Sequence, residues 1–172
     1  MQPPFGLGAR SLDISTPSEY NQHNNTALNG IQKGKGMVYW RLFYHITWAT
    51  KTREPLVTAE IEAEIHQLIR SNAVSQGARV HAVNGMPDHI HLIASIPPSI
   101  DLSTFVGRVK GATSAIHNKE HPEQRIEWQR SYAIFSLDAK RLPHHVAYVE
   151  NQKDHHRDAT TFAVLERDGS EK

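Results

Sequence analysis

From Val38 onward the chain alternates between two apolar periodicities, and the order in which they follow one another leaves few folds open. Runs of β-branched and aromatic residues, which are typical of strands, cover residues 38–50, 79–84, 89–96 and 128–137, the last as a strand or a hairpin. Apolar residues at helical spacing predict helices over 58–77 and 102–116, and a third from Pro143 to about Asp158. The order β-α-β-β-α-β with one appended helix predicts an α+β, ferredoxin-like fold with an antiparallel sheet.

Local signals set the expected ends and faces of these helices. Thr58 suits the N-cap of the first helix, because its hydroxyl can accept a hydrogen bond from a free N–H of the first turn. Gly77 suits its end, since glycine readily adopts the left-handed conformation that follows many helices. The buried face of the second helix is expected to hold Leu102, Phe105, Val106, Val109 and Ile116.

Residues 1–36 differ in composition from the rest of the chain. They hold five of the ten glycines and three of the nine prolines, and they show neither helical nor strand periodicity. This composition predicts a flexible N-terminal tail. Met37 is a candidate start codon, in which case the tail is a start-site artefact, and N-terminal sequencing of the native protein tests this. The domain is expected over residues 37–160, with a short C-terminal tail at 161–172.

Composition excludes several classes of protein. The chain has no cysteine, which rules out disulfides, cysteine-ligated metal sites and a cysteine nucleophile. Lys and Arg number 19 against 18 Asp and Glu, so the bulk charge gives no argument for nucleic acid. No run of about 18 apolar residues predicts a membrane span, and no secretory signal is visible. We therefore expect a cytoplasmic protein without a membrane partner. Histidine is unusually abundant, with 12 copies.

Two of these histidines, His89 and His91, lie two residues apart on a predicted strand. Side chains at this spacing share one face of a strand, with their Cα atoms roughly 7 Å apart. Two imidazoles placed in this way can bind one divalent cation. The alternative is a pair of histidines on a half-exposed strand without a ligand. Asp88 precedes the pair in a turn and is expected to point away from it.

The last predicted helix carries a second polar set. Tyr148 and Gln152 are one helical turn apart and therefore neighbours on one face, which His144 and His155 extend. A tyrosine hydroxyl can attack phosphorus and retain the bond as a phosphodiester. The alternative is a solvated helix face with a partly buried tyrosine. From the residues alone, both interpretations stay open.

Taken together, five segments in this order resemble the single-tyrosine HUH transposases, in which U is a hydrophobic residue. The resemblance runs from about Trp40 to His156, and its most specific part is Met86–Ile93, with the HUH strand behind a Pro-Asp turn. The other segments are Tyr44–Lys51, Val109–Gly111 followed by Ser114, Trp128–Tyr132, and Tyr148–Gln152 followed by His155 and His156. Features of both the REP-associated and the insertion-sequence branches of the family are present.

The resemblance implies a function and a set of site residues. His89 and His91 would bind one Mg²⁺ or Mn²⁺ ion, with Gln152 as the third protein ligand. Tyr148 would attack a DNA phosphate, giving a 5′-phosphotyrosine and a free 3′-OH. The substrate would be single-stranded DNA beside a hairpin, bound by a monomer or a homodimer. The cations expected to contact DNA phosphates are Lys51, Arg53, Arg108, Lys110 and Arg130.

Two other functions use the same residues differently. A domesticated protein would bind single-stranded DNA hairpins without cleaving them. A metal-dependent phosphoesterase would act without a covalent intermediate and would tolerate the loss of Tyr148.

Overall fold

A computed structural model describes residues 39–170 of the chain. The predicted flexible tail at 1–36 lies outside the described residues, as do residues 37, 38, 171 and 172. Within the described part, no helix is long and apolar enough to cross a membrane. The cytoplasmic location stays a prediction.

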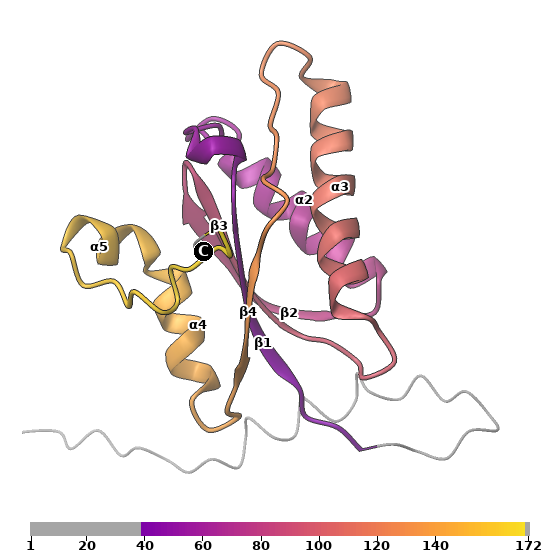
Figure 1. Cartoon of the computed structure of the whole chain (residues 1–172), viewed down its shortest axis with the longest axis vertical. Coiled ribbons are helices and arrows are strands. Elements are labelled where there is room, and N and C mark those ends of the chain that lie inside the picture. Colours follow the sequence, from indigo (N-terminus) through magenta and orange to yellow (C-terminus); the bar gives the residue numbers. More distant parts are fainter. Residues whose placement is uncertain (1–38, 171–172) are drawn as a thin grey trace, which may run out of the picture. The chain divides into compact units, whose positions relative to one another are not determined.

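The described chain forms an α+β fold in the predicted order (Figure 1). The strands are β1 (Phe43–Ala49), β2 (Arg79–Met86), β3 (His89–Ser95) and β4 (Ala133–Leu137). The helices are the short 3₁₀ turn η1 (Lys51–Arg53), α2 (Glu62–Ser75), α3 (Leu102–Glu120), α4 (Leu142–Glu150) and α5 (Gln152–Arg157). The prediction of a ferredoxin-like arrangement is confirmed.

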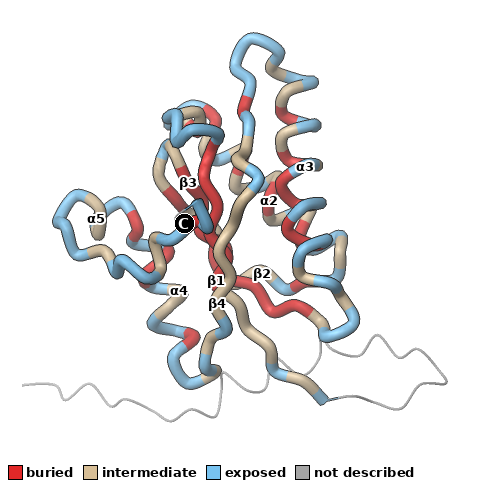
Figure 2. Tube along the Cα trace, in the orientation of Figure 1, coloured by how far each residue is buried: buried red, intermediate tan, exposed pale blue. Residues whose placement is uncertain are grey.

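The sheet has the strand order β2-β3-β1-β4, and every pair of neighbours is antiparallel. β3 and β1 are therefore the inner strands, and β3 is buried along its whole length (Figure 2). The register places Thr47 of β1 opposite His91 of β3, and Ala49 opposite His89. The polar residues of the two inner strands consequently lie beside one another on a single face of the sheet.

Strand alternation divides the sheet into two faces with different partners. Ile46, Ile90 and Leu92 belong to the main hydrophobic cluster, which also contains Ile65 of α2 and Phe105 of α3. Helices α2 and α3 therefore cover this face. The opposite face carries α4, which packs against β2 and β3 (Figure 1). There a smaller cluster joins Ile93 of β3 and Ala82 of β2 to Leu142, Tyr148 and Val149 of α4.

The first helix begins later than its capping signal predicted. Glu62 is the first residue of α2 and Ile61 its N-cap, so the expectation for Thr58 is wrong. The Thr58 backbone carbonyl instead accepts from the N–H groups of Ile61 and Glu62, and its hydroxyl accepts from Gln124. The prediction for Gly77 agrees with the structure, because this residue follows the helix with a φ of 87°.

The second helix is longer than predicted and differs at one face residue. Asp101 caps it by accepting a hydrogen bond from the Thr104 N–H at 2.7 Å. Ile116 is 38% exposed, so its expected burial is wrong. The buried stripe of α3 runs instead through Val109, Thr113 and His117, which are spaced by whole helical turns.

The predicted last helix is divided at Asn151, whose backbone (φ −98°, ψ 21°) leaves the helical region. Tyr148 therefore belongs to α4 and Gln152 to α5. The predicted strand at 128–137 is also shorter, since only Ala133–Leu137 joins the sheet as β4. Trp128 forms an isolated bridge with Thr50. Residues 161–172 were expected as a tail beyond the domain, whereas Leu165 packs against the α4 cluster and Asp168 is only 1% exposed.

Candidate active site

The predicted pair His89 and His91 lies on the sheet face that α4 covers. The side chains are 2% and 0% exposed, so the alternative of a half-exposed pair does not apply. Their ring centroids are 5.0 Å apart. Strand alternation brings both rings to the same side, while the intervening Ile90 faces the main hydrophobic core.

Asp88 fixes the orientation of His89. Its Oδ1 accepts a hydrogen bond from His89 Nδ1 at 2.6 Å, and its Oδ2 is 2.8 Å from Nη1 of Arg53. These contacts lower the pKa of Asp88 to about 2, mainly through the hydrogen bond from His89. The expectation that Asp88 points away is wrong, because the residue lies in the turn, where strand alternation does not hold. When His89 is neutral, a proton held on Nδ1 by Asp88 leaves the Nε2 lone pair for a ligand.

His91 has a corresponding partner on β1. His45 Nε2 lies 2.8 Å from His91 Nδ1, and Thr47 Oγ1 lies within 3.4 Å of both rings. Burial lowers the pKa of His45 to about 3, so this imidazole is neutral. A proton on His91 Nδ1 can therefore be donated to His45, which leaves the Nε2 lone pair of His91 free. His45 and Thr47 were not predicted here, although their spacing on a strand places them on one face.

Tyr148 and Gln152 contact Glu166, the residue that also lies beside His89 and His91. Tyr148 is 6% exposed and Gln152 is 0% exposed. The Tyr148 hydroxyl donates to Glu166 Oε1 at 2.5 Å and accepts from the Phe162 N–H at 3.1 Å. Gln152 Nε2 donates to the same Glu166 oxygen at 2.8 Å. Burial, together with the Glu166 carboxylate, raises the pKa of Tyr148 to about 12, so this hydroxyl is protonated at neutral pH.

Glu166 joins the two halves of the site and was not predicted from the sequence. Its Oε2 is 3.3 Å from Nε2 of His89, 3.3 Å from Nε2 of His91 and 3.2 Å from Nε2 of His156. Burial alone would raise the pKa of Glu166, but the contacts with His89 and His91 outweigh it and hold the pKa well below its usual range. Glu166 follows the last helix in a segment without periodicity, so no sequence signal marks it.

Each of the three predicted metal ligands has a buried polar atom without a hydrogen-bond partner among the described residues, as does His45 at Nδ1. The ligand atoms are Nε2 of His89, Nε2 of His91 and Oε1 of Gln152. Unpaired buried polar atoms are costly, and here three of them belong to the predicted metal ligands. His89, His91 and Glu166 also offer ligand atoms that all lie within 4.8 Å of one another. Imidazole nitrogens with amide and carboxylate oxygens fit one divalent cation.

The five predicted DNA-binding cations occupy different environments. Lys51 is exposed and pairs with Glu127, and Arg53 pairs with Asp88 and Asp168. Both residues follow β1 directly, at the end of the sheet where His89 begins β3. Arg130 is exposed in the loop that reaches the same end through the bridge between Thr50 and Trp128.

Lys110 does not belong to a DNA-binding surface. It is 7% exposed, and its ammonium group donates hydrogen bonds to the backbone carbonyls of Gln129, Arg130 and Ser131. Burial lowers its pKa to about 8. The sequence correctly predicts Lys110 on a helix. It does not show that the loop at 129–131 folds over the side chain.

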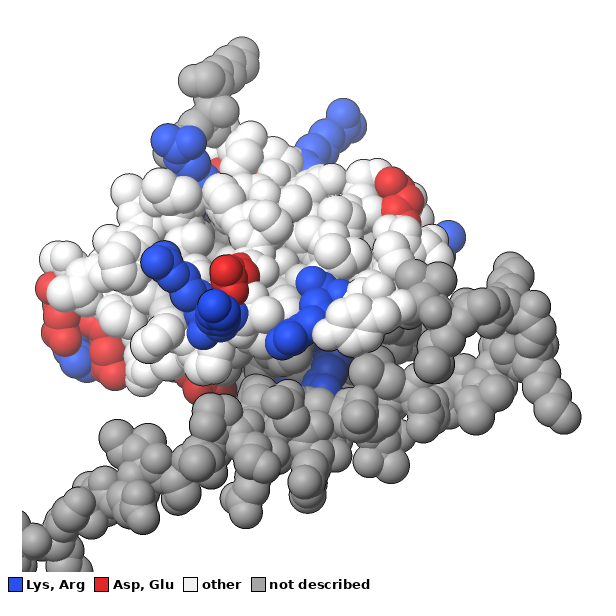
Figure 3. Space-filling model, turned by 90° about the horizontal axis from the view of Figure 1, so that it is seen from below, with Lys and Arg blue, Asp and Glu red and all other residues white. Residues whose placement is uncertain are grey.

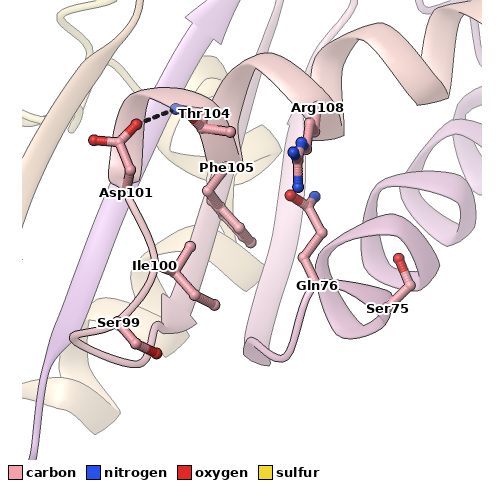
Figure 4. A pocket seen from close by; sticks show the side chains of 8 residues that line it. All are labelled: Ser75, Gln76, Ser99, Ile100, Asp101, Thr104, Phe105 and Arg108. Atoms are coloured by element: carbon pink, nitrogen blue, oxygen red, sulfur yellow. Dashed lines mark hydrogen bonds between the residues drawn. The ribbon is translucent and has the colours of Figure 1, made fainter.

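Arg108 is exposed but lies near the start of α3, which follows the opposite end of β3. There it lines a cavity of about 320 Å³ between α2 and α3, together with Gln76, Asp101 and Phe105 (Figure 4). This cavity shares no residue with the His89 site. Seen from below, the molecule shows scattered basic and acidic side chains on a mostly uncharged face (Figure 3). The described residues visible there form no continuous basic surface.

The fold and the site together define a class of protein. An antiparallel sheet presents a His-x-His pair from an inner strand, and the last helices present a tyrosine and a glutamine to that pair. This is the arrangement of single-tyrosine HUH enzymes. The family model described as "Transposase IS200 like" matches residues 38–152, and the chain belongs to this transposase family.

Individual relatives agree with this assignment. The ISDra2 transposase TnpA of Deinococcus radiodurans is 29% identical over 130 residues, which cover 72% of this chain and 92% of that protein. The transposase for insertion sequence element IS200 of Salmonella typhimurium is 25% identical over 111 residues, covering 61% of this chain and 73% of that protein.

Solved structures show the same fold. A crystal structure of a Deinococcus radiodurans protein assigned as a transposase superposes with a TM-score of 0.56 at 29% identity, covering 71% of this chain and 98% of that one. A REP-associated tyrosine transposase bound to a REP hairpin gives a TM-score of 0.51 at 19% identity. That likeness covers 72% of this chain and 74% of the other, and it concerns the fold alone.

Proposed function

We propose that this transposase cleaves and rejoins single-stranded DNA beside a hairpin, with Tyr148 as the nucleophile. The observation that carries the proposal is the convergence of Tyr148 with three buried, unpartnered ligand atoms, from His89, His91 and Gln152. A hydroxyl nucleophile beside side chains that can bind a divalent cation is an arrangement suited to phosphodiester cleavage.

The chemistry balances without a nucleotide cofactor. The Tyr148 oxygen attacks the scissile phosphorus, a tyrosine–phosphorus bond forms, and the bond from phosphorus to the leaving 3′ oxygen breaks. The Tyr148 proton passes to water, because Glu166, whose pKa lies well below its usual range, is a poor base, and the leaving oxygen is protonated as a 3′-OH. A second DNA 3′-OH can then attack the 5′-phosphotyrosine, so the net reaction is strand transfer.

His89 and His91 would hold one Mg²⁺ or Mn²⁺ ion, with the side-chain oxygen of Gln152 as the third ligand. When bound, such a cation polarises the phosphate and supports the leaving oxygen. Asp88 and His45 position the two imidazoles by accepting hydrogen bonds at their second ring nitrogens. Glu166 lies beside the same two imidazoles. Its side chain would have to move away or become a further ligand of the cation when DNA binds.

The DNA would approach the end of the sheet where β3 begins. Lys51, Arg53 and Arg130 belong to segments that gather there, and they are the cations we propose for phosphate contacts. One structural relative is bound to a REP hairpin, and we propose a hairpin as the substrate here as well. The proposed protein acts as a monomer or a homodimer.

The test uses full-length protein and single-stranded DNA that covers the hairpins flanking the gene. With Mn²⁺ we expect a protein–DNA adduct that survives a denaturing gel, that EDTA abolishes, and that Tyr148→Phe does not form. Tyr132→Phe is the matched control and should form the adduct at the wild-type level. Turnover that persists in Tyr148→Phe but fails in His89→Ala would indicate a phosphoesterase. Tight hairpin binding with no adduct on any flanking DNA would indicate a binding protein.

A further inference from the structure

A second group of metal-binding side chains lies between α2 and α3, on the sheet face opposite to the proposed active site (Figure 1). It consists of Glu64 in the first turn of α2, His117 in the last turn of α3, and His121, the residue that caps the C-terminal end of α3. His121 follows His117 by four residues and its N–H donates to the His117 carbonyl, so the two rings lie beside one another. None of the three takes part in the site around His89.

The hydrogen bonds of His117 leave one ring nitrogen available. His117 is fully buried, and its Nε2 donates to the backbone carbonyl of Gln124 at 2.9 Å. A carbonyl can only accept, so the proton of a neutral ring is fixed on Nε2. Nδ1 then presents its lone pair to Glu64 Oε1 at 2.8 Å, where two acceptors face each other. Either an additional proton between the two atoms or a cation bound beside both of them must satisfy these lone pairs.

His121 presents a similar contact to the second carboxylate oxygen. Its Nε2 lies 3.0 Å from Glu64 Oε2, and its ring stacks on His117 with centroids 4.7 Å apart. Ligand atoms from all three residues lie within 4.8 Å of one another. Metal-bound histidines commonly donate their other ring N–H to a backbone carbonyl, which is what His117 does.

We propose that Glu64, His117 and His121 bind a divalent transition-metal ion, with Zn²⁺ as the best fit. Two imidazole nitrogens and a carboxylate suit Zn²⁺ better than Mg²⁺ or Ca²⁺, which prefer oxygen ligands. Side-chain exposures of 33% for Glu64 and 41% for His121 leave room for water as a further ligand.

The ion would have a structural role. It would join the start of α2 to the end of α3, and through Gln124 it would hold the loop that follows α3. That loop is also tied back by Asn118, whose side chain bonds both backbone groups of Ile126, and by the contact between Gln124 and Thr58. It leads to Trp128 and Arg130, which reach the proposed DNA-binding end of the molecule.

The test compares full-length wild type with His121→Ala, whose substitution site is partly exposed, and with His144→Ala, an exposed histidine on α4, as the matched control. Zn²⁺ content after dialysis is measured by atomic emission. We expect His121→Ala to hold one ion fewer per chain than wild type, and His144→Ala to hold the same number. Zn²⁺ should raise the unfolding temperature less in His121→Ala than in the control.

Binding at the His89 site cannot imitate this result, because His89→Ala should keep the ion that His121→Ala loses. Glu64→Gln, which preserves side-chain volume, provides a second variant and should bind Zn²⁺ at least about tenfold more weakly. Equal Zn²⁺ content and equal stabilisation in wild type, His121→Ala and Glu64→Gln would overturn the proposal. The cluster would then be an ion pair between a protonated His117 and Glu64.

Discussion

At the scale of single residues, each imidazole of the proposed active site is oriented by a partner on its second ring nitrogen. Asp88 accepts from His89, and neutral His45 faces His91. Because both partners hold Nδ1, both Nε2 atoms point to the space beside Gln152 and Tyr148. Burial lowers the pKa of His45 below its value in the unfolded chain. The free energy of unfolding therefore depends on pH.

We expect the free energy of unfolding to fall as the pH is lowered from 7 to 5. The pKa of His45 is lowered from 6.5 to about 3, so between these values the unfolded chain binds a proton that the folded chain does not. Stability is therefore present above pH 6.5 and is lost progressively as the pH falls towards 3. The loss at pH 5 is on the order of 2 kcal/mol.

The measurement is urea denaturation in EDTA at both pH values. His45→Gln should lose less stability between pH 7 and 5 than the wild type does, because glutamine does not titrate. The exposed His144→Gln is the control and should keep the wild-type difference. An equal pH dependence in wild type and His45→Gln would show that His45 is protonated in the folded protein.

At the scale of secondary-structure elements, two glycines with similar space around them differ in backbone conformation. Gly77 ends α2 with a φ of 87°, and a side chain there would meet no atom closer than 3.8 Å. Gly107 lies within α3, where a side chain would meet nothing within 4 Å. Backbone conformation, and not space, distinguishes the two positions.

Alanine substitutions at these two glycines should therefore change stability in opposite directions. Gly77→Ala should destabilise the protein by about 1 kcal/mol, because alanine disfavours a positive φ. Gly107→Ala should stabilise it by about 0.5–1 kcal/mol through its greater helix propensity. Chemical denaturation of the two variants beside wild type tests both signs, and destabilisation by Gly107→Ala would contradict the helical assignment.

Lys110 and Arg108 on α3 form a second contrast within one element. Lys110→Met should destabilise the protein by about 2–3 kcal/mol, because it leaves carbonyls of the 129–131 loop without their buried donor. Arg108→Met, at an exposed position of the same helix, should change stability by no more than about 0.5 kcal/mol. Thermal unfolding compares them, and equal effects would contradict the anchoring role of Lys110.

At the scale of the whole molecule, the site is assembled from segments far apart in the chain. Thr47 of β1 donates to the backbone carbonyl of Leu165, and Glu166 contacts both β3 and α4. Arg53, which follows β1 in the chain, forms an ion pair with Asp168. The C-terminal segment thus completes the site, and the Glu166 carboxylate adds to the effect of burial on the pKa of Tyr148.

Replacing Glu166 should lower the pKa of Tyr148. In the wild type, burial and the Glu166 carboxylate raise that pKa to about 12. Glu166→Ala removes the carboxylate but not the whole effect of burial, so the pKa should fall below 12 and remain above 10. Ultraviolet titration isolates Tyr148 by difference from the matching Tyr148→Phe protein. Glu150→Ala, an exposed carboxylate on α4, should leave the pKa unchanged, and an unchanged pKa in Glu166→Ala would contradict the contact.

From the sequence we could predict the order of strands and helices, the common face of His89 and His91, and the closeness of Tyr148 to Gln152. These features follow from local periodicity, which sets the side of a strand or helix on which each residue lies. Three features are visible only in the folded chain, namely the direction of Asp88, the burial of Lys110 and the position of Glu166 in the site. Those features depend on which distant segments pack together. The spacing of neighbouring residues does not predict such long-range packing.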